Sequence, residues 1–233
     1  NDVHFVELTG SVTGEVDEET YCIPPPIDAG MEDLRIDVDG VGYAYTDEAG
    51  NFAIEVPDGL PKPVEFKLKG LHCRTTNQAE GAPDAVINTT GTPGVPLDVY
   101  WDDTNSTAAE RDCFYHQNRI YDHIKSIVGS MSLGQLDGQF LCNVNIESTC
   151  NAYFVNVPAS INFYKEGSGC GNTGEIADVI YHEYGHGIDY YLSGFEIGQM
   201  GEGFADIFMT MANDQLWALR NDGRLHATDE GST

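Results

Sequence analysis

The chain has 233 residues and a formal net charge of -27, because 38 Asp and Glu residues face only 11 Lys and Arg residues. Such an excess of acid is repelled by the phosphates of nucleic acids and by anionic membrane surfaces, so we exclude both as main partners. Hydrophobic residues make up 41% of the chain, which is enough to build a folded core. No apolar run is long enough to cross a bilayer, so the composition predicts a folded acidic protein without a membrane span.

Short alternating segments dominate residues 1–69, which we predict to form an N-terminal antiparallel β-sandwich. In each segment apolar and polar side chains alternate with period two, which places one row in a core and the other in solvent. The dipeptide Asp39-Gly40 has the composition of a hairpin turn. The segment from Tyr45 to Phe52 resembles the carboxypeptidase-regulatory-like sandwich modules, and this resemblance implies a structural module without chemistry of its own. The alternating segments are residues 34–38, 41–45, 52–56 and 64–68.

Residues 70–103 are rich in Gly, Pro, Thr and Asn and have few periodic positions. We predict a linker and irregular connection there, with one strand at 96–100. A helix is predicted to begin near Thr107, because Thr107 and Glu110 have the spacing of a capping box, and to end at Gly129.

Residues 104–233 are predicted to form one α+β domain. After the first helix, apolar residues in residues 139–164 are typical of strands, and two helical patterns close the chain. These helices are predicted at 174–193 and 202–220.

His182 and His186 lie within the first of these two helices, four residues apart. Residues at this spacing lie about 40° apart around the helix and one turn apart along it, so both imidazoles can reach one metal ion. Glu183 follows the first histidine but points elsewhere, which keeps it off the metal and close to the water that a metal binds. The alternative is a pair of histidines on a helix surface with no ligand.

Glu202, at the start of the second helix, supplies what the histidine pair lacks. Two histidines leave tetrahedral zinc short of a third protein ligand, and a carboxylate from a facing helix would complete the set with one position open for water. Asp206 lies one turn further on, where it could accept the other ring N–H of a ligand histidine. Glycines on both sides of Glu202 would allow the two helices to approach closely. The alternative is an ordinary acidic helix start, which the helix dipole favours.

The segments His-Glu-Tyr-Gly-His-Gly at 182–187 and Gly-Glu-Gly-Phe-Ala-Asp at 201–206 resemble the gluzincin metallopeptidases, the thermolysin-like group, and most closely the fungalysin family. The helical segment 113–122 and the Asn-Ala-Tyr-Phe segment at 151–154 agree with this resemblance, which covers about residues 95 to 215. It implies a thermolysin-like zincin domain, with a mixed sheet and active-site helices, and a polypeptide substrate.

The resemblance also implies roles for individual residues. One catalytic Zn²⁺ would be held by His182, His186 and Glu202, with Glu183 as general base and Asp206 orienting a ligand histidine. The substrate main chain would be bound along an edge strand. The residues implied for this strand are Asn151, Ala152 and Tyr153.

The chain departs from the family pattern near its C-terminus. The family uses a further donor after the second zinc helix to stabilise the oxyanion, and His226 is the only later histidine, which makes it the candidate. The C-terminal lobe, which forms the far wall of the cleft in the family, is largely absent. Three explanations stay open: the chain is a fragment of a longer protein, the domain is minimal, or a C-terminal segment or second chain completes the cleft.

Six cysteines, none of them in a Cys-x-x-Cys pair, predict disulfides and an oxidising, extracellular compartment. Connectivity stays open at this point. The pairs we favour are Cys22 with Cys73, Cys142 with Cys150, and Cys113 with Cys170.

Three clusters of acidic and amide side chains, at 37–39, 47–51 and 102–105, could hold Ca²⁺ or could be solvated turns, and none has EF-hand spacing. His116 and His123 are predicted to pack or to be exposed, because no metal ligand is spaced with them.

The predicted function is that of a secreted zinc endopeptidase, in which Glu183 takes a proton from a metal-activated water. Two alternatives stay open. A gluzincin exopeptidase would carry a Gly-x-Met-x-Asn strand, where this chain has Asn-Ala-Tyr-Phe. A catalytically weak or inert zinc-bearing module for binding or adhesion would use the sandwich as its working part.

Overall fold

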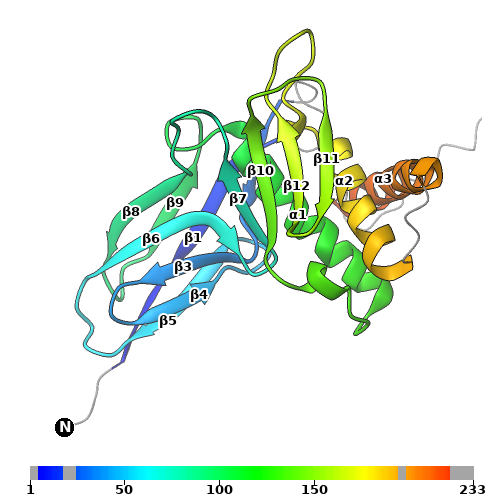
Figure 1. Ribbon diagram of the computed structural model, residues 1–233. Helices are drawn as coiled ribbons and strands as arrows, with labels where there is room; N and C mark the ends of the chain where they lie inside the picture. The colour runs from blue at the N-terminus through cyan, green and yellow to red at the C-terminus, as the bar shows by residue number, and fades with distance from the viewer. Residues whose placement is uncertain (1–4, 18–24, 194–197, 221–233) are drawn as a thin grey trace, which may run out of the picture.

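The computed structural model describes residues 5–17, 25–193 and 198–220, and the fold of these residues mixes strands and helices. Figure 1 shows the strands from the first hundred residues at one end of the molecule and helices α2 and α3 at the other. The strands are β1 (Val6–Val16), β2 (Ile27–Gly30), β3 (Leu34–Val38), β4 (Gly42–Tyr45), β5 (Asn51–Val56), β6 (Lys62–Gly70), β7 (Cys73–Asn77), β8 (Val86–Gly91), β9 (Leu97–Trp101), β10 (Phe140–Ile146), β11 (Ala152–Asn156) and β12 (Ala159–Tyr164). The helices are α1 (Ala108–Val128), α2 (Ala177–Ile188) and α3 (Gly198–Arg220), with short 3₁₀ turns η1 (Gly134–Asp137) and η2 (Thr173–Glu175) and a π turn η3 (Asp189–Ser193).

Two sheets meet face to face in the N-terminal part. The first has the order β2-β1-β5, and β9 also pairs with β1; the second contains β3, β4, β6 and β8. Their inner faces supply apolar side chains to one core, in which the rings of Phe52 and Phe66 meet edge to face at 6.1 Å. The predicted N-terminal strands are thus confirmed, except that β9 pairs with β1 in parallel, so this part is not wholly antiparallel.

The second sheet continues beyond the N-terminal part. Its order is β11-β12-β10-β7-β6-β3-β4, and β7, β10 and β12 run parallel to one another. Strand β11 is antiparallel to β12 and lies at the end of the order, so its second edge pairs with no strand in the described residues. The prediction of an irregular connection at 70–103 was wrong, because β7 and β8 join this sheet. Strands β7 and β8 contain polar Thr and Asn residues, so they lack the hydrophobic pattern by which strands are predicted from a sequence. The strand predicted at 96–100 within this stretch is confirmed as β9, which joins the other sheet. The domain boundaries at 69 and 103 stay predictions.

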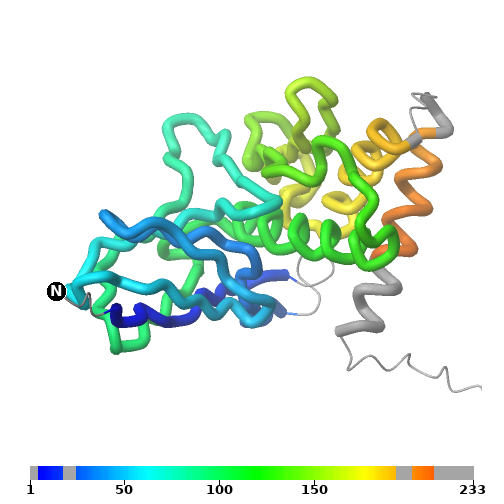
Figure 2. The backbone as a smooth tube through the Cα atoms, turned by 90° about the horizontal axis from the view of Figure 1, so that it is seen from below, coloured from blue at the N-terminus to red at the C-terminus, as the bar shows by residue number. Residues whose placement is uncertain are grey.

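Helix α1 has the predicted ends. Thr107 and Glu110 form the capping box, with the Glu110 N–H donating to Thr107 Oγ1 at 3.3 Å and the Thr107 N–H donating to the Glu110 carboxylate at 3.0 Å. Gly129 ends the helix with a φ of 61°, which glycine adopts without strain. Figure 2 shows α1 extending from the N-terminal strands towards α3, so this helix connects the two parts of the molecule.

The two predicted C-terminal helices are present, with different bounds. The predicted helix at 174–193 divides into η2, α2 and the π turn η3, and the predicted helix at 202–220 begins four residues earlier, at Gly198. Residues 194–197 lie outside the described residues. Within the described part of the chain, no helix is long and apolar enough to cross a membrane.

Candidate metal centre and cleft

Helix α2 presents both histidines of the sequence motif to the same point. His182 and His186 are one turn apart, and their Nε2 atoms lie 3.1 Å from each other. Both side chains are partly exposed, at 20% each. Two ring nitrogens that approach this closely need either a shared proton or a shared cation between them.

Glu202 approaches the same point from helix α3. Its Oε2 lies 3.3 Å from His182 Nε2 and 3.5 Å from His186 Nε2. Ligand atoms about 2.0–2.2 Å from a tetrahedral zinc ion lie about 3.3–3.6 Å apart. Both distances to Glu202 fall within this range, and the 3.1 Å between the two histidine nitrogens is slightly shorter. Among the residues that the structure describes, these three form the one group of His, Cys, Asp or Glu side chains close enough to hold a metal.

Asp206 determines which nitrogen of His182 is available. Its Oδ1 lies 3.0 Å from His182 Nδ1. A carboxylate there accepts the Nδ1–H, which leaves the lone pair on Nε2, the atom that faces His186 and Glu202. The predicted orienting role of Asp206 therefore has the geometry that it needs.

Gly185 lets the two helices approach each other. A Cβ at Gly185 would lie 3.1 Å from Phe208 Cδ1 and 3.2 Å from Ala205 Cα, both on α3. The prediction that the glycines flanking Glu202 allow this approach was wrong. In the described residues, a Cβ at Gly203 would meet no atom within 4 Å, and a Cβ at Gly201 would meet only Asp189 Oδ2, at 3.6 Å.

Glu183 lies beside the group of His182, His186 and Glu202, but its carboxyl group is buried. It is only 5% exposed, it accepts a hydrogen bond from the Phe154 N–H on β11, and its Oε2 has no donor among the described residues. Burial, followed by the charge of Glu202, raises the pKa of Glu183 to about 8, although the Phe154 hydrogen bond opposes this rise. This carboxyl group is thus buried, close to the ligands and placed to exchange a proton.

The electrostatic surroundings of His186 suit a metal ligand. Burial lowers its pKa, and the neighbouring His182 lowers it further, although nearby carboxylates partly oppose this effect. A neutral imidazole keeps the lone pair that coordinates a metal.

A cleft of about 750 Å³ runs along β11 and over these residues. The Tyr164 N–H donates to the main-chain carbonyl oxygen of Asn151, so the main chain of residue 151 faces β12. Because facing directions alternate along a strand, the N–H and C=O of Ala152 and Phe154 point to the unpaired edge. Phe154 meets Glu183 there, which leaves the Ala152 main chain to face the cleft. Tyr153 also lines the cleft, and its ring packs edge to face on Tyr164.

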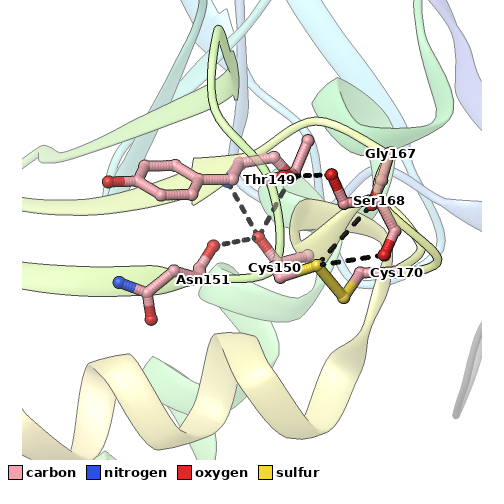
Figure 3. Close-up of a disulfide and its surroundings, with 8 residues drawn as sticks. Thr149, Cys150, Asn151, Gly167, Ser168 and Cys170 are labelled. Carbon is pink, nitrogen blue, oxygen red and sulfur yellow. Dashed lines mark hydrogen bonds between the residues drawn. A yellow bond between two sulfur atoms is a disulfide. The ribbon is translucent and has the colours of Figure 1, made fainter.

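A disulfide secures this end of the cleft. Cys150 is bonded to Cys170, and Figure 3 shows the bond directly beside Asn151, the residue before β11. The pairs Cys142–Cys150 and Cys113–Cys170 predicted from the sequence were therefore wrong. The loops before β11 and after β12 meet because these strands pair, and sequence spacing did not reveal this.

The remaining cysteines are not bridged as predicted. Among the described residues, Cys73, Cys113 and Cys142 form no disulfide; they are fully buried thiols between the sheet and α1, with the Cys73 and Cys142 sulfurs 3.6 Å apart. Cys22 lies outside the described residues, so its pairing with Cys73 has no support here.

Other candidate residues from the sequence lie away from the centre. His116 is buried and contacts the Tyr181 hydroxyl at 2.8 Å and the Asp17 carbonyl at 2.7 Å, and His123 is buried on α1. Both agree with a packing role. His226 lies outside the described residues, so its role as oxyanion donor stays a prediction.

The three acidic turns considered for calcium use their oxygens internally. Asp37 pairs with Arg35, Asp47 accepts from the Ala49 and Asn51 N–H groups, and Asp102 accepts from Thr104. The contacts of Asp47 and Asp102 are those of ordinary turns, and the contact of Asp37 is an ion pair along β3.

Two residues of the cleft were missed in the sequence. Asp189 and Tyr190 follow α2 and line the cleft opposite β11 residues, with the Tyr190 ring 6.1 Å from that of Phe154. The signal was their position directly after the histidine motif, but the π turn that directs them was not predictable from the helical pattern.

No protein-family model matches this chain, and no curated protein is significantly similar to it. The assignment of function therefore depends on the site itself.

Proposed function

We propose that the protein is a zinc-dependent endopeptidase of the gluzincin type. The observation that carries this proposal is the convergence of His182, His186 and Glu202 beside a buried carboxyl group, Glu183, at an unpaired strand edge. The three donors are two imidazoles and one carboxylate, which is the ligand set of many catalytic zinc sites.

When bound, the zinc ion would supply Lewis acidity to a water molecule and to a substrate carbonyl. The residues of this chain would do the rest. Glu183 would take a proton from the water and return it to the leaving amine, and its place between the ligands and β11 suits both transfers. Asp206 would hold His182 in the tautomer that donates from Nε2.

The substrate would be an extended polypeptide that pairs with β11. The Ala152 N–H and C=O point to the cleft, and main-chain pairing of this kind accepts many side chains. A cleft that follows the strand from Asn151 to Asn156 suits internal segments of a peptide, which favours endopeptidase over exopeptidase action.

We also propose that the enzyme works outside the cell. The Cys150–Cys170 disulfide supports an oxidising compartment, and the strong negative charge opposes binding to nucleic acid or to anionic membranes. Whether a C-terminal segment or a second chain completes the cleft is part of this proposal and is open to test.

The test combines metal content with hydrolysis of a fluorogenic peptide that is blocked at both ends. We expect about one zinc per chain and internal cleavage by the wild type. Glu183→Gln should keep the zinc and lower kcat by about 10²–10⁴-fold, whereas Glu166→Gln, on an exposed loop, should match the wild type.

Each alternative predicts a different result. A zinc-loaded Glu183→Gln variant as fast as the wild type would show that the base is wrong. An exopeptidase would leave the blocked peptide intact but cleave its unblocked form. A binding module would hold zinc and cleave neither peptide, and less than about half a zinc per chain would contradict the ligand set.

A further inference from the structure

A second polar cavity, of about 470 Å³, lies between helix α1 and the loop that joins β2 to β3. It shares no lining residue with the cleft. Asn118 and Asp122, one turn apart on α1, line it from one side, and Glu32 lines it from the loop.

Negative charge is concentrated at this cavity. The carboxyl groups of Glu32 and Asp122 lie within hydrogen-bonding reach of each other, and those of Asp33 and Glu48 are close enough to act on Glu32. Burial, followed by these neighbours, raises the pKa of Glu32 to about 7. Two carboxylates in contact need a proton or a cation between them.

Positive groups nearby have other contacts. Arg119 lines the cavity, but its guanidinium donates to the Tyr115 hydroxyl and lies over that ring, 5.1 Å from its centre. His72 Nε2 is 3.8 Å from Asp33 Oδ2, and His123 lines the cavity from α1.

Asn118 provides an independent indication of a ligand. Its side chain is 1% exposed, and its Nδ2 donates to the Glu32 main-chain oxygen at 3.2 Å. Its Oδ1 is buried and has no donor in the described residues. A buried amide oxygen without a partner destabilises the fold. A proton shared by Glu32 and Asp122 would relieve the carboxylates but would leave this oxygen unpaired, whereas a cation would satisfy all three groups.

We propose that this cavity is a calcium site in which Glu32, Asp122 and the Asn118 Oδ1 bind one Ca²⁺ and thereby join the β2–β3 loop to α1. The donors are all oxygens, two of them carboxylates, which is the set that hard cations prefer. Ca²⁺ takes six to eight oxygens, and the cavity has room for water at the remaining positions. Neither this site nor its test depends on peptide hydrolysis.

The primary test measures Ca²⁺ binding to the full chain with its zinc kept saturated, in about 0.15 M NaCl to screen weak surface binding. Calorimetric titration with CaCl₂ should give one ion per chain and a higher Tm. Asp122→Asn and Glu32→Gln should each weaken binding at least tenfold. Asp102→Asn, in a turn whose oxygens are used internally, is the matched control and should bind as the wild type does.

Either of two results would overturn the proposal: no uptake by the wild type at millimolar Ca²⁺, or Asp122→Asn binding as tightly as the wild type. Equal uptake of Mg²⁺ and Ca²⁺ would refute the assignment to calcium. Both variants remove charge repulsion, so they should fold, and circular dichroism checks this.

A second measurement locates the ion. Tb³⁺ replaces Ca²⁺ and emits when a nearby aromatic ring is excited, and Tyr115 lines the cavity. Tyr115→Phe should bind Ca²⁺ as before but lose most of the sensitised emission that Ca²⁺ displaces. Undiminished emission from this variant would place the ion elsewhere and overturn the assignment.

Discussion

The N-terminal sheets and the helices bury polar groups in different ways. Among the described residues, the core between the sheets is almost wholly apolar, and the buried Thr46 there accepts a hydrogen bond from the Leu34 N–H at the start of β3. Helix α1 instead buries a row of polar residues, and α2 buries Glu183. Burial of polar groups opposes folding unless they are partnered. We therefore expect the functional sites of the protein to lie where the helices bury polar side chains.

The helices themselves divide into two kinds of polar burial. On α1, Arg111 donates to the Glu15 carbonyl at 2.7 Å and the Glu110 carboxylate accepts from the Ala85 N–H at 2.9 Å, so these residues dock the helix on the strands. Glu183 and Asn118 keep an oxygen without a donor in the described part of the chain. Asp112 and Gln117 on α1 also keep a buried oxygen without such a donor, so we infer a ligand only where a cavity adjoins the residue, as at Glu183 and Asn118.

Removal of zinc should have the largest effect, and it should affect the helices but not the N-terminal sheets. With 1,10-phenanthroline, which leaves Ca²⁺ bound, hydrolysis should fall at least about a thousandfold and return when Zn²⁺ is added. Hydrogen exchange of β1 and β6 should not change, because these strands lie away from the centre. Loss of protection there would show that the two parts are one energetic unit.

Phe66→Ala should lower the stability of the N-terminal sheets. Phe66 is fully buried against Phe52, so its truncation should lower the free energy of unfolding by about 3–5 kcal/mol. Leu60→Ala, at a side chain 59% exposed, should change it by less than about 0.5 kcal/mol. Denaturant titration measures both. A lower kcat per folded molecule in Phe66→Ala would contradict the separation of roles.

Gly185→Ala should displace α3 from α2. The new methyl group would lie 3.1–3.2 Å from Phe208 and Ala205, and such overpacking costs about 1–3 kcal/mol. Zinc affinity should fall with stability, because Glu202 is carried by α3. Gly203→Ala is the matched control: its methyl group meets nothing within 4 Å in the described residues, so helix propensity should make it neutral or stabilising. If Gly203→Ala lost more stability than Gly185→Ala, the close contact assigned to Gly185 and α3 would be refuted.

Asp206→Asn should weaken zinc binding about 10–100-fold, because His182 would lose the carboxylate that orients it. Competition with a zinc indicator measures the change. Asp39→Asn, on an exposed hairpin turn, should leave the affinity unchanged. An unaltered affinity in Asp206→Asn would mean that the contact has no role in metal binding.

The smallest effect concerns pH. Burial, followed by the charges of Asp17 and Glu166, raises the pKa of Glu175 to about 7 in the folded chain, although Arg111 opposes this. The folded state therefore holds this proton more tightly than the unfolded state, so its contribution to stability is complete below about pH 4.5 and is lost as the pH rises through about 7. Because the side chain is partly exposed, we expect a Tm decrease of only about 2–4 °C over this range.

Glu175→Gln should remove this part of the pH dependence, and Glu7→Gln, on the exposed side of β1, should retain it. Calorimetry at several pH values provides the measurement. An identical pH profile in Glu175→Gln would show that another group is responsible.

Much of the fold was predictable because its signals are local. The alternation of residues 34–38 and 52–56 predicted β3 and β5, and the Thr107–Glu110 capping box predicted the start of α1, since each depends on neighbouring residues alone. Strands β7 and β8 were not predicted, because their side chains are polar and their place depends on pairing with distant strands.

The candidate site divides in the same way. The sequence by itself determined the identity of the donors, because a spacing of four residues in a helix brings His182 and His186 to one side whatever surrounds it. Only the tertiary structure decided that Gly185 admits α3, that Cys150 pairs with Cys170 and that the edge of β11 is unpaired. Those features depend on contacts between segments far apart in the chain. A local sequence pattern does not show which distant segments will meet.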